Sequence, residues 1–279
     1  GRAPYKSVLT HGFVMDDKGR KMSKSTGNVV DPLKVISQSG ADIIRLWVMS
    51  SDYTEDLRIG QEIIKTNTES YRKLRNTLRF LLGNLDNFDT KDAVPFAEMP
   101  ELERFILHKL YETDATIRAA YNSYDFRRVY QSLFNFMTFD LSSLYFDIRK
   151  DTLYCDPLSS QTRRGCQSTL DQVFNCLTAW LAPILAFTME EVWQSRYPDE
   201  NDSVHLRQFP DIPSEWKDDG LADRWNQIRN VRRAVTGALE IERREKRIGS
   251  SLEAAPSVYI EDAALYNIVT SADMADICI

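Results

Sequence analysis

Residues 71–85 read Tyr-Arg-Lys-Leu-Arg-Asn-Thr-Leu-Arg-Phe-Leu-Leu-Gly-Asn-Leu. At the helical period, the apolar side chains of this segment fall on one face: Tyr71, Leu74, Leu78, Leu81 and Leu85. The polar face carries four cations and no acid over its first part: Arg72, Lys73, Arg75 and Arg79. The segment therefore predicts an amphipathic helix that packs one face into a core and leaves a basic face outside.

The same period extends along most of the chain on both sides of this segment. It predicts helices over roughly 61–86, 99–121, 125–149, 160–181, 187–196 and 219–247, which together form a helical bundle. Residues 198–217 contain three prolines and are expected to be a loop over the bundle. After Gly249, a strand at 257–260, a helix at 262–270 and a last strand ending at Ile279 predict the start of a small α+β unit.

A shorter pattern precedes the long helices. Residues 6–15 alternate as a strand does, and the turn chemistry of 16–19 predicts that the chain folds back there. A polar loop follows over 20–28. Asp31-Pro32 has the form of an N-cap with proline at the first helical position, so a helix is expected up to Gly40 and a second one from Ala41.

Composition excludes several classes of protein. The length of 279 residues suits about two domains, and 43% hydrophobic with 27% charged residues is ordinary globular usage, which excludes disorder. The net charge of −6 argues against a protein that coats nucleic acid with its whole surface. No apolar stretch is long enough for a bilayer span, and no N-terminal apolar leader is seen. A soluble, monomeric, cytoplasmic protein is expected.

Three groups of residues favour structural roles over chemistry. Cysteines at 155, 166, 176 and 278 form no pair with metal-ligand spacing, so no metal site is predicted. Three scattered histidines, at 11, 108 and 205, are expected to be structural or exposed. The aromatic side chains that recur at helical spacing are assigned to the core: Tyr121, Tyr124, Phe126, Tyr130, Phe134, Phe136, Phe139, Tyr145 and Phe146.

The loop at 18–27 is the strongest candidate for chemistry. It holds Lys18, Arg20, Lys21 and Lys24 among glycine, serine and threonine residues that leave backbone and hydroxyl donors uncovered. Such a loop suits a polyphosphate, because positive charge is needed where negative charge develops. A solvated basic turn is the alternative, and a Walker A motif is excluded because its spacing does not occur.

Two helical faces are candidates for RNA. On the helix predicted over 61–86, Arg72, Arg75 and Arg79 share the basic face, which suits RNA phosphates, a solvated face or docking to a neighbouring domain. Residues 224–247 hold eight cations against three acids, and Arg229, Arg233 and Arg244 are expected on the outer face of that helix. A solvated stripe is the alternative there also.

The order of residues in the loop carries a family resemblance. Lys21-Met22-Ser23-Lys24-Ser25, followed by Thr26-Gly27-Asn28, is the signature loop of class I aminoacyl-tRNA synthetases. Further blocks resemble the isoleucyl members of that class: 8–13, 40–48, 51–53, 75–85 and 248–254. The valyl members, which are built on the same plan, are the runner-up, and a non-catalytic tRNA-binding module that has inherited the bundle is a second alternative.

The resemblance implies a domain plan and a chemistry. Residues 1–58 would be the end of a Rossmann-type catalytic domain, 59–249 a helical anticodon-binding domain, and 250–279 a truncated α+β junction. Lys21 and Lys24 would be catalytic, and Lys21, Met22, Ser23, Lys24 and Ser25 would contact ATP with Mg²⁺, while isoleucine is joined to tRNA(Ile). The class's His-Ile-Gly-His motif is absent from the sequence. That motif and the editing domain are expected before Gly1, and a zinc site only beyond Ile279, so the chain alone is expected to be inactive.

Overall fold

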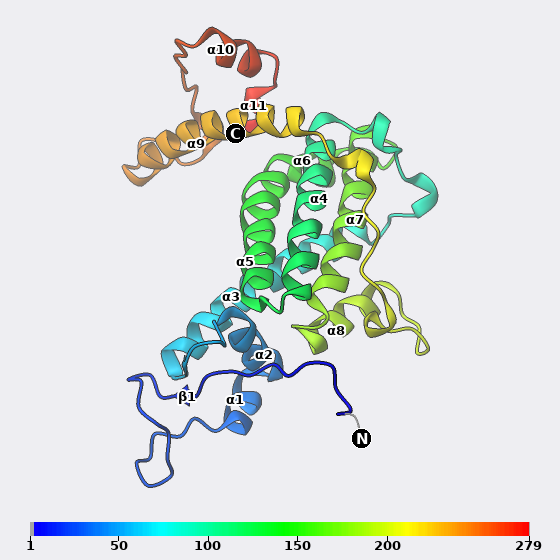
Figure 1. The fold of residues 1–279 in the computed structure, drawn as a ribbon. Helices are drawn as coiled ribbons and strands as arrows, with labels where there is room; N and C mark the ends of the chain where they lie inside the picture. The colour runs from blue at the N-terminus through cyan, green and yellow to red at the C-terminus, as the bar shows by residue number, and fades with distance from the viewer. Residues whose placement is uncertain (1–2, 279) are drawn as a thin grey trace.

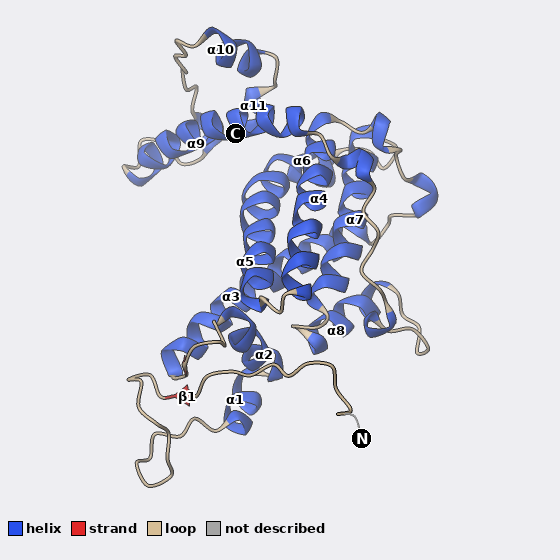
Figure 2. Ribbon diagram, viewed as in Figure 1, coloured by secondary structure: helices blue, strands red, loops and turns tan. Residues whose placement is uncertain are grey.

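The computed structural model describes residues 3–278 and is built almost entirely from helices (Figure 2). The long helices form an upright bundle, a small unit with the N-terminus lies at one end of it, and α9 (Asp219–Arg244) crosses the other end (Figure 1). The mainly helical fold class is therefore confirmed. None of the helices in residues 3–278 combines the length and apolar character that a membrane crossing needs.

The N-terminal unit surrounds two short strands. Strand β1 (Val14–Met15) pairs in parallel with β2 (Leu57–Arg58), and helices α1 (Pro32–Ser39) and α2 (Ala41–Ser50) lie between them in sequence. Asp31 caps α1 by accepting the amide of Leu33, as its place before a proline predicts. A small apolar cluster of Trp47, Leu57 and Ile59 holds the unit together.

The strand expected over 6–15 is wrong in extent. Only Val14 and Met15 are strand, because the parallel partner that supplies ladder hydrogen bonds is itself two residues long. The predicted fold-back after residue 15 is present, since the Asp16 amide donates to the Arg20 carbonyl at 3.0 Å and Met15 bridges Lys21 in antiparallel fashion.

The bundle follows the predicted helices closely. Its elements are α3 (Gln61–Leu85), α4 (Glu101–Asn122), α5 (Phe126–Asn135), α6 (Phe146–Cys155), α7 (Gln161–Leu181) and α8 (Ala186–Arg196). The apolar face of residues 71–85 is buried as expected, with Leu74, Leu78 and Leu81 at most 1% exposed. It packs in one core with α4 and α7, in which Phe105, near the start of α4, and Trp180, near the end of α7, are fully buried.

The helix expected over 125–149 differs in its middle and in its end. Residues Phe136–Tyr145 form a π-helix between α5 and α6, and the helix continues to Cys155. The hydroxyls of Ser142 and Ser143 donate to carbonyls five residues earlier, a spacing that matches the wider helix. The rotated π segment turns Phe139 outward (57% exposed), and Tyr124 at the helix turn is 47% exposed, so the core assignment is wrong for these two rings.

The N-terminal unit is joined to the bundle by side chains of α2. The buried carboxylate of Asp42 accepts the Thr188 amide at 2.8 Å and its hydroxyl at 2.6 Å, in the first turn of α8. The N-cap residue of α8 is Leu185, which offers no acceptor, so Asp42 caps that helix from a distance. Arg45 donates to the carbonyls of Pro183 and Ile184 at 2.7 and 2.8 Å.

Removing this remote cap is expected to loosen the joint. Asp42→Ala leaves the first amides of α8 without their acceptor, and we expect the free energy of unfolding to fall by about 1–2 kcal/mol in a urea titration. The matched control is Asp31→Ala, which removes an exposed cap from the eight-residue α1. Equal losses from the two variants would show that Asp42 is an ordinary cap and not a joint between two units.

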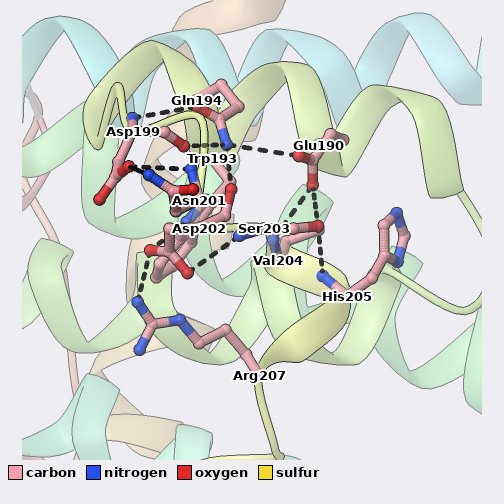
Figure 3. A network of polar contacts seen from close by, with 10 residues as sticks. All are labelled: Glu190, Trp193, Gln194, Asp199, Asn201, Asp202, Ser203, Val204, His205 and Arg207. Atoms are coloured by element: carbon pink, nitrogen blue, oxygen red, sulfur yellow. Dashed lines mark hydrogen bonds and ion pairs between the residues drawn. The ribbon is translucent and has the colours of Figure 1, made fainter.

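The segment after α8 is a loop, as its prolines predict, and it is fastened to that helix. Figure 3 shows Glu190, Trp193 and Gln194 of α8 directed toward the segment that follows. Glu190 accepts the Ser203 hydroxyl at 2.7 Å, and Asp202 accepts the Trp193 indole N–H at 3.1 Å. These bonds fix the path by which the chain returns to the far end of the bundle, where α9 begins.

The C-terminal part is helical throughout its regular structure. Residues 257–260 form no strand, and the regular elements that follow are the helices α10 (Ala263–Thr270) and α11 (Met274–Cys278). The prediction of an α+β unit is therefore wrong within residues 250–278. The end of the predicted last strand, Ile279, lies outside the described residues. The reason is a missing strand partner, because this segment packs on α9 through helices instead. Arg224 donates to the Ser271 hydroxyl at 3.0 Å, and Arg232 to the Ile277 carbonyl at 2.7 Å.

Candidate functional site

The predicted signature loop projects from the N-terminal unit between β1 and α1, at the end of the molecule remote from α9 (Figure 1). Its first limb leaves β1, turns at Gly19, whose φ of +74° suits glycine, and returns through the bridge between Met15 and Lys21. The second limb runs from Asn28 to the cap of α1. The loop therefore stands on a strand at one end and a helix at the other.

Asp16 is the organising residue of the first limb. Its side chain accepts the backbone amides of Lys18 and Arg20 at 3.0 and 2.7 Å and the Arg20 guanidinium at 2.9 Å. It also accepts the Asn28 amide at 3.0 Å, and these bonds, that of Asn28 first, hold the pKa of Asp16 well below its ordinary value. The carboxylate thus contributes stability above its unfolded pKa and loses it only as the pH falls through the lowered folded value.

The tip of the loop presents the two predicted lysines. Residues 24–27 form a turn closed by the Gly27 amide on the Lys24 carbonyl at 3.2 Å. Lys21 and Lys24 are exposed and have no ion-pair partner in residues 3–278, whereas Arg20 is paired with Asp16 at 2.8 Å. Two of the other predicted ATP contacts differ from each other in exposure. Ser25 is exposed, whereas Met22 packs against the small apolar cluster and anchors the loop there.

Asn28 is a site residue that the sequence reasoning did not single out. Its Nδ2 donates to Asp16 and to the Lys21 carbonyl at 3.1 Å, and its Oδ1 accepts the Ser23 amide at 2.9 Å. The signal was present in the sequence, because Asn28 ends the Thr26-Gly27-Asn28 stretch that follows Lys21–Ser25. What the sequence does not contain is the proximity of Asp16, twelve residues earlier.

A cleft of about 690 Å³ lies beside the loop, between α1 and α3. Arg72, one of the predicted RNA-binding residues, lines it together with Lys34 and Lys65. On the same helix, Arg75 is 3.4 Å from Glu191, and Arg79 is exposed with no ion-pair partner among residues 3–278. Arg72 at this cleft is therefore the predicted α3 arginine that shares a hollow with Val29 and Val30, the residues that follow the loop.

The structure separates the three arginines predicted on α9. Arg229 is turned to the bundle, where its guanidinium contacts the Asp140 carboxylate at 2.7 Å and only 22% of its side chain is exposed. Burial raises the pKa of Asp140, and the positive charge of Arg229 opposes that rise. Arg233 and Arg244 are exposed, and neither has an ion-pair partner within the described part of the chain.

The described residues offer no set of metal ligands. No group of three or more His, Cys, Asp or Glu side chains in residues 3–278 is placed to hold a metal ion. Asp16, the carboxylate beside the loop, is already occupied by four donors and does not fit Mg²⁺. Cys166, Cys176 and Cys278 are buried, and Cys155 is exposed.

Comparison with known proteins gives matches over the whole chain. Residues 1–60 match the family model described as tRNA synthetases class I (I, L, M and V), and residues 103–260 match that of the anticodon-binding domain of tRNA ligase. The isoleucine–tRNA ligase of Agrobacterium fabrum is 57% identical over all 279 residues, and that of Brucella abortus is 56% identical over the same length.

These relatives are longer proteins. The chain spans 29% of the length of the Agrobacterium fabrum ligase and 28% of the Brucella abortus one. Among solved structures, a ternary complex of Agrobacterium radiobacter LeuRS with tRNA and LeuAMS matches 75% of this chain and 24% of its own, with a TM-score of 0.59 and 19% identity. At that identity the likeness concerns the fold alone.

Proposed function

The chain belongs to the anticodon-binding domain family of tRNA ligases, and on this premise we propose that it is the part of an isoleucine–tRNA ligase that joins the ATP-contacting loop to the anticodon-binding bundle. The complete ligase activates isoleucine with ATP and transfers it to tRNA(Ile). The family model of residues 1–60 covers four amino-acid types, so the choice of isoleucine is supported by the relatives at 56–57% identity.

One observation carries the catalytic part of the proposal. Lys21 and Lys24 stand exposed, without carboxylate partners among residues 3–278, on a loop whose neighbouring cation Arg20 is neutralised by Asp16. Unpaired lysines on a projecting loop are free to approach a triphosphate. The nearby buried acid, Asp16, pairs with Arg20 and so leaves the charges of the two lysines available. This arrangement favours a phosphate-binding loop over a solvated basic turn.

The chemistry assigned to the loop is electrostatic. An oxygen of the isoleucine carboxylate attacks the α-phosphorus of ATP, the bond from that phosphorus to the β-phosphate oxygen breaks, and pyrophosphate leaves. Negative charge grows on the α-phosphate and on the leaving group, and the Lys24 ammonium, supported by Lys21, stabilises it there. Mg²⁺ bound to the ATP phosphates would share the neutralisation of this charge.

The RNA-binding part of the proposal is divided along the molecule. Arg72 and Arg79 lie on α3, the helix that begins at the loop end of the structure, and Arg233 and Arg244 lie on α9, which crosses the opposite end (Figure 1). A tRNA presents its acceptor end and its anticodon far apart, so two separated basic surfaces suit it. Arg75 is weakly paired with Glu191, and Arg229 is bound to Asp140, which makes Arg229 the least suited of the predicted set.

The exposed arginines of α9 are expected to contribute to tRNA affinity. Replacing Arg233 and Arg244 together with glutamine removes two phosphate contacts, and we expect the slope of log K against log salt for tRNA(Ile) to flatten by about 1.5. Filter binding at several salt concentrations measures the slope. The matched comparison is Arg229→Gln, which is expected to leave the slope unchanged; equal slopes in all three proteins would make this face a solvated surface.

A further inference from the structure

We propose that Asn28 is a positioning residue of the signature loop, which closes its neck and sets where Lys21 and Lys24 stand relative to ATP. The inference rests on the proposed function, because the loop is taken to contact ATP. It assigns to Asn28 no contact with substrate. Its role is to connect the two limbs of the loop to each other and to the strand from which the loop departs.

The amide of Asn28 reaches three places on the opposite limb. It donates to the Asp16 carboxylate at 3.0 Å and to the Lys21 carbonyl at 3.1 Å, and it accepts the Ser23 amide at 2.9 Å. Donor and acceptor are both used, so no other side chain of similar size reproduces all three bonds. The contacts bracket Lys21 directly, with one bond on its carbonyl and one on the amide two residues later.

The anchor on the other side is rigid. Asp16 is 3% exposed and follows β1, which is paired with β2 and packed on the small apolar cluster. Two backbone amides and the Arg20 guanidinium hold its carboxylate in place, so the fourth acceptor position is presented to Asn28 in a fixed direction. A hydrogen bond to an ionised, preorganised acceptor is stronger than a neutral one.

The rest of the loop tip depends on this connection. Within residues 3–278, the hydrogen bonds of residues 23–27 are internal, except for the bond from Ser23 to Asn28. Without the Asn28 side chain, the tip keeps its own turn but loses the hydrogen bond from Ser23, and the bridge at Lys21 and the packing of Met22 and Val30 in the apolar cluster remain. The two lysines then sample more positions, which reduces the fraction of time in which they face the phosphates.

The first test reads the loop itself and does not depend on catalysis. Trypsin cleaves after lysine only where the backbone opens, so the rates of cleavage after Lys21 and Lys24 report the closure of the neck. In the 279-residue chain, we expect Asn28→Ala to raise both rates about tenfold relative to the parent sequence. Asn226→Ala, an exposed asparagine on α9, is the control. Rates at the loop no higher than in this control would overturn the proposal.

The second test reads catalysis in the complete ligase. We expect Asn28→Ala to lower kcat for isoleucine-dependent ATP–pyrophosphate exchange about tenfold with an unchanged KM for isoleucine. Transfer from preformed adenylate to tRNA, which no longer uses the triphosphate, should keep its rate. A general loss of folding would lower both steps together. Equal losses in both, or none in exchange, would contradict a positioning role.

Exchanging the carboxylate and the amide between positions 16 and 28 distinguishes an effect of the hydrogen bond between them from an effect of side-chain size. Asn28→Asp places two carboxylates against each other and should be slower than Asn28→Ala. Adding Asp16→Asn restores one N–H to carboxylate bond in the opposite direction, and exchange should recover above the Asn28→Asp level. Absence of recovery would contradict the proposed contact.

Wild-type ligase and Lys24→Ala belong in the same series. No isoleucine-dependent exchange in the wild type would remove the proposed function itself. Exchange that depends on Lys24 but is insensitive to Asn28 would remove only the role of Asn28.

Discussion

Replacing Lys24 with alanine in the complete ligase is expected to lower the rate of isoleucyl-adenylate formation by a factor of about 100 or more. The ammonium is exposed on the loop tip and meets no carboxylate within residues 3–278, so its charge is available to the phosphates. Removing a preorganised charge that acts in the transition state costs about 3 kcal/mol, which corresponds to that factor. ATP–pyrophosphate exchange measures the rate.

The same variant should leave isoleucine binding nearly intact, because the loop is assigned to the phosphates and not to the amino acid. Lys217→Ala is the control, since that exposed lysine lies in the segment before α9 and pairs with Asp219 on the surface. An exchange rate within a factor of about two of wild type in Lys24→Ala would refute the assigned role. A rise in the KM for isoleucine with unchanged kcat would indicate that the loop acts on isoleucine and not on the ATP phosphates, which would contradict the proposal.

The second large effect concerns the buried ion pair inside the bundle. Glu103 is fully buried, and Arg149 contacts its two carboxylate oxygens at 2.8 and 3.0 Å. Tyr145 and Cys166 also donate to this carboxylate, at 3.2 and 3.1 Å. Burial alone would lower the pKa of Arg149, but the adjacent Glu103 carboxylate raises it above its ordinary value, so the arginine stays charged.

Arg149→Met is expected to lower the free energy of unfolding by about 3–5 kcal/mol, because it leaves the Glu103 charge buried without a cation. Urea titration at neutral pH followed by circular dichroism measures this. The double variant Glu103→Gln with Arg149→Met removes both charges and should recover a large part of the loss. The exposed pair of Lys91 and Asp89, 3.6 Å apart, supplies the control: Lys91→Met should cost about 0.5 kcal/mol or less. Losses of equal size in Arg149→Met and in Lys91→Met would contradict the account of the pair.

The helices could be predicted because their signal is local. The face formed by Leu74, Leu78 and Leu81 repeats at the helical period, and the structure buries it as the period requires. The π-helix at Phe136–Tyr145 could not be predicted, since its turns are set by packing and by hydroxyls such as Ser142 that bond five residues back. Strands were the least predictable elements, because residues 6–13 and 257–260 alternate correctly but find no partner strand.

In the candidate site also, residues marked by a local sequence signal could be predicted, and residues that act through tertiary contacts could not. Lys21 and Lys24 were found through a contiguous signature, and the structure leaves both exposed as that role requires. Arg229 was placed on the outer face by helical geometry alone, but Asp140, which lies 89 residues earlier in the sequence, takes up its charge. The roles of Asp42 and Asn28 could not be predicted for the same reason, since each side chain acts through a partner that only the tertiary fold brings near. The domain boundaries, the monomeric state and the cytoplasmic location stay predictions.

The most direct measurement is ATP–pyrophosphate exchange by the complete ligase with isoleucine, valine and leucine compared as the amino acid. The proposed function predicts that exchange is strongest with isoleucine. Exchange strongest with valine would contradict it in favour of the valyl members of the class, and no exchange with any of the three would leave the chain as a tRNA-binding module without the proposed chemistry.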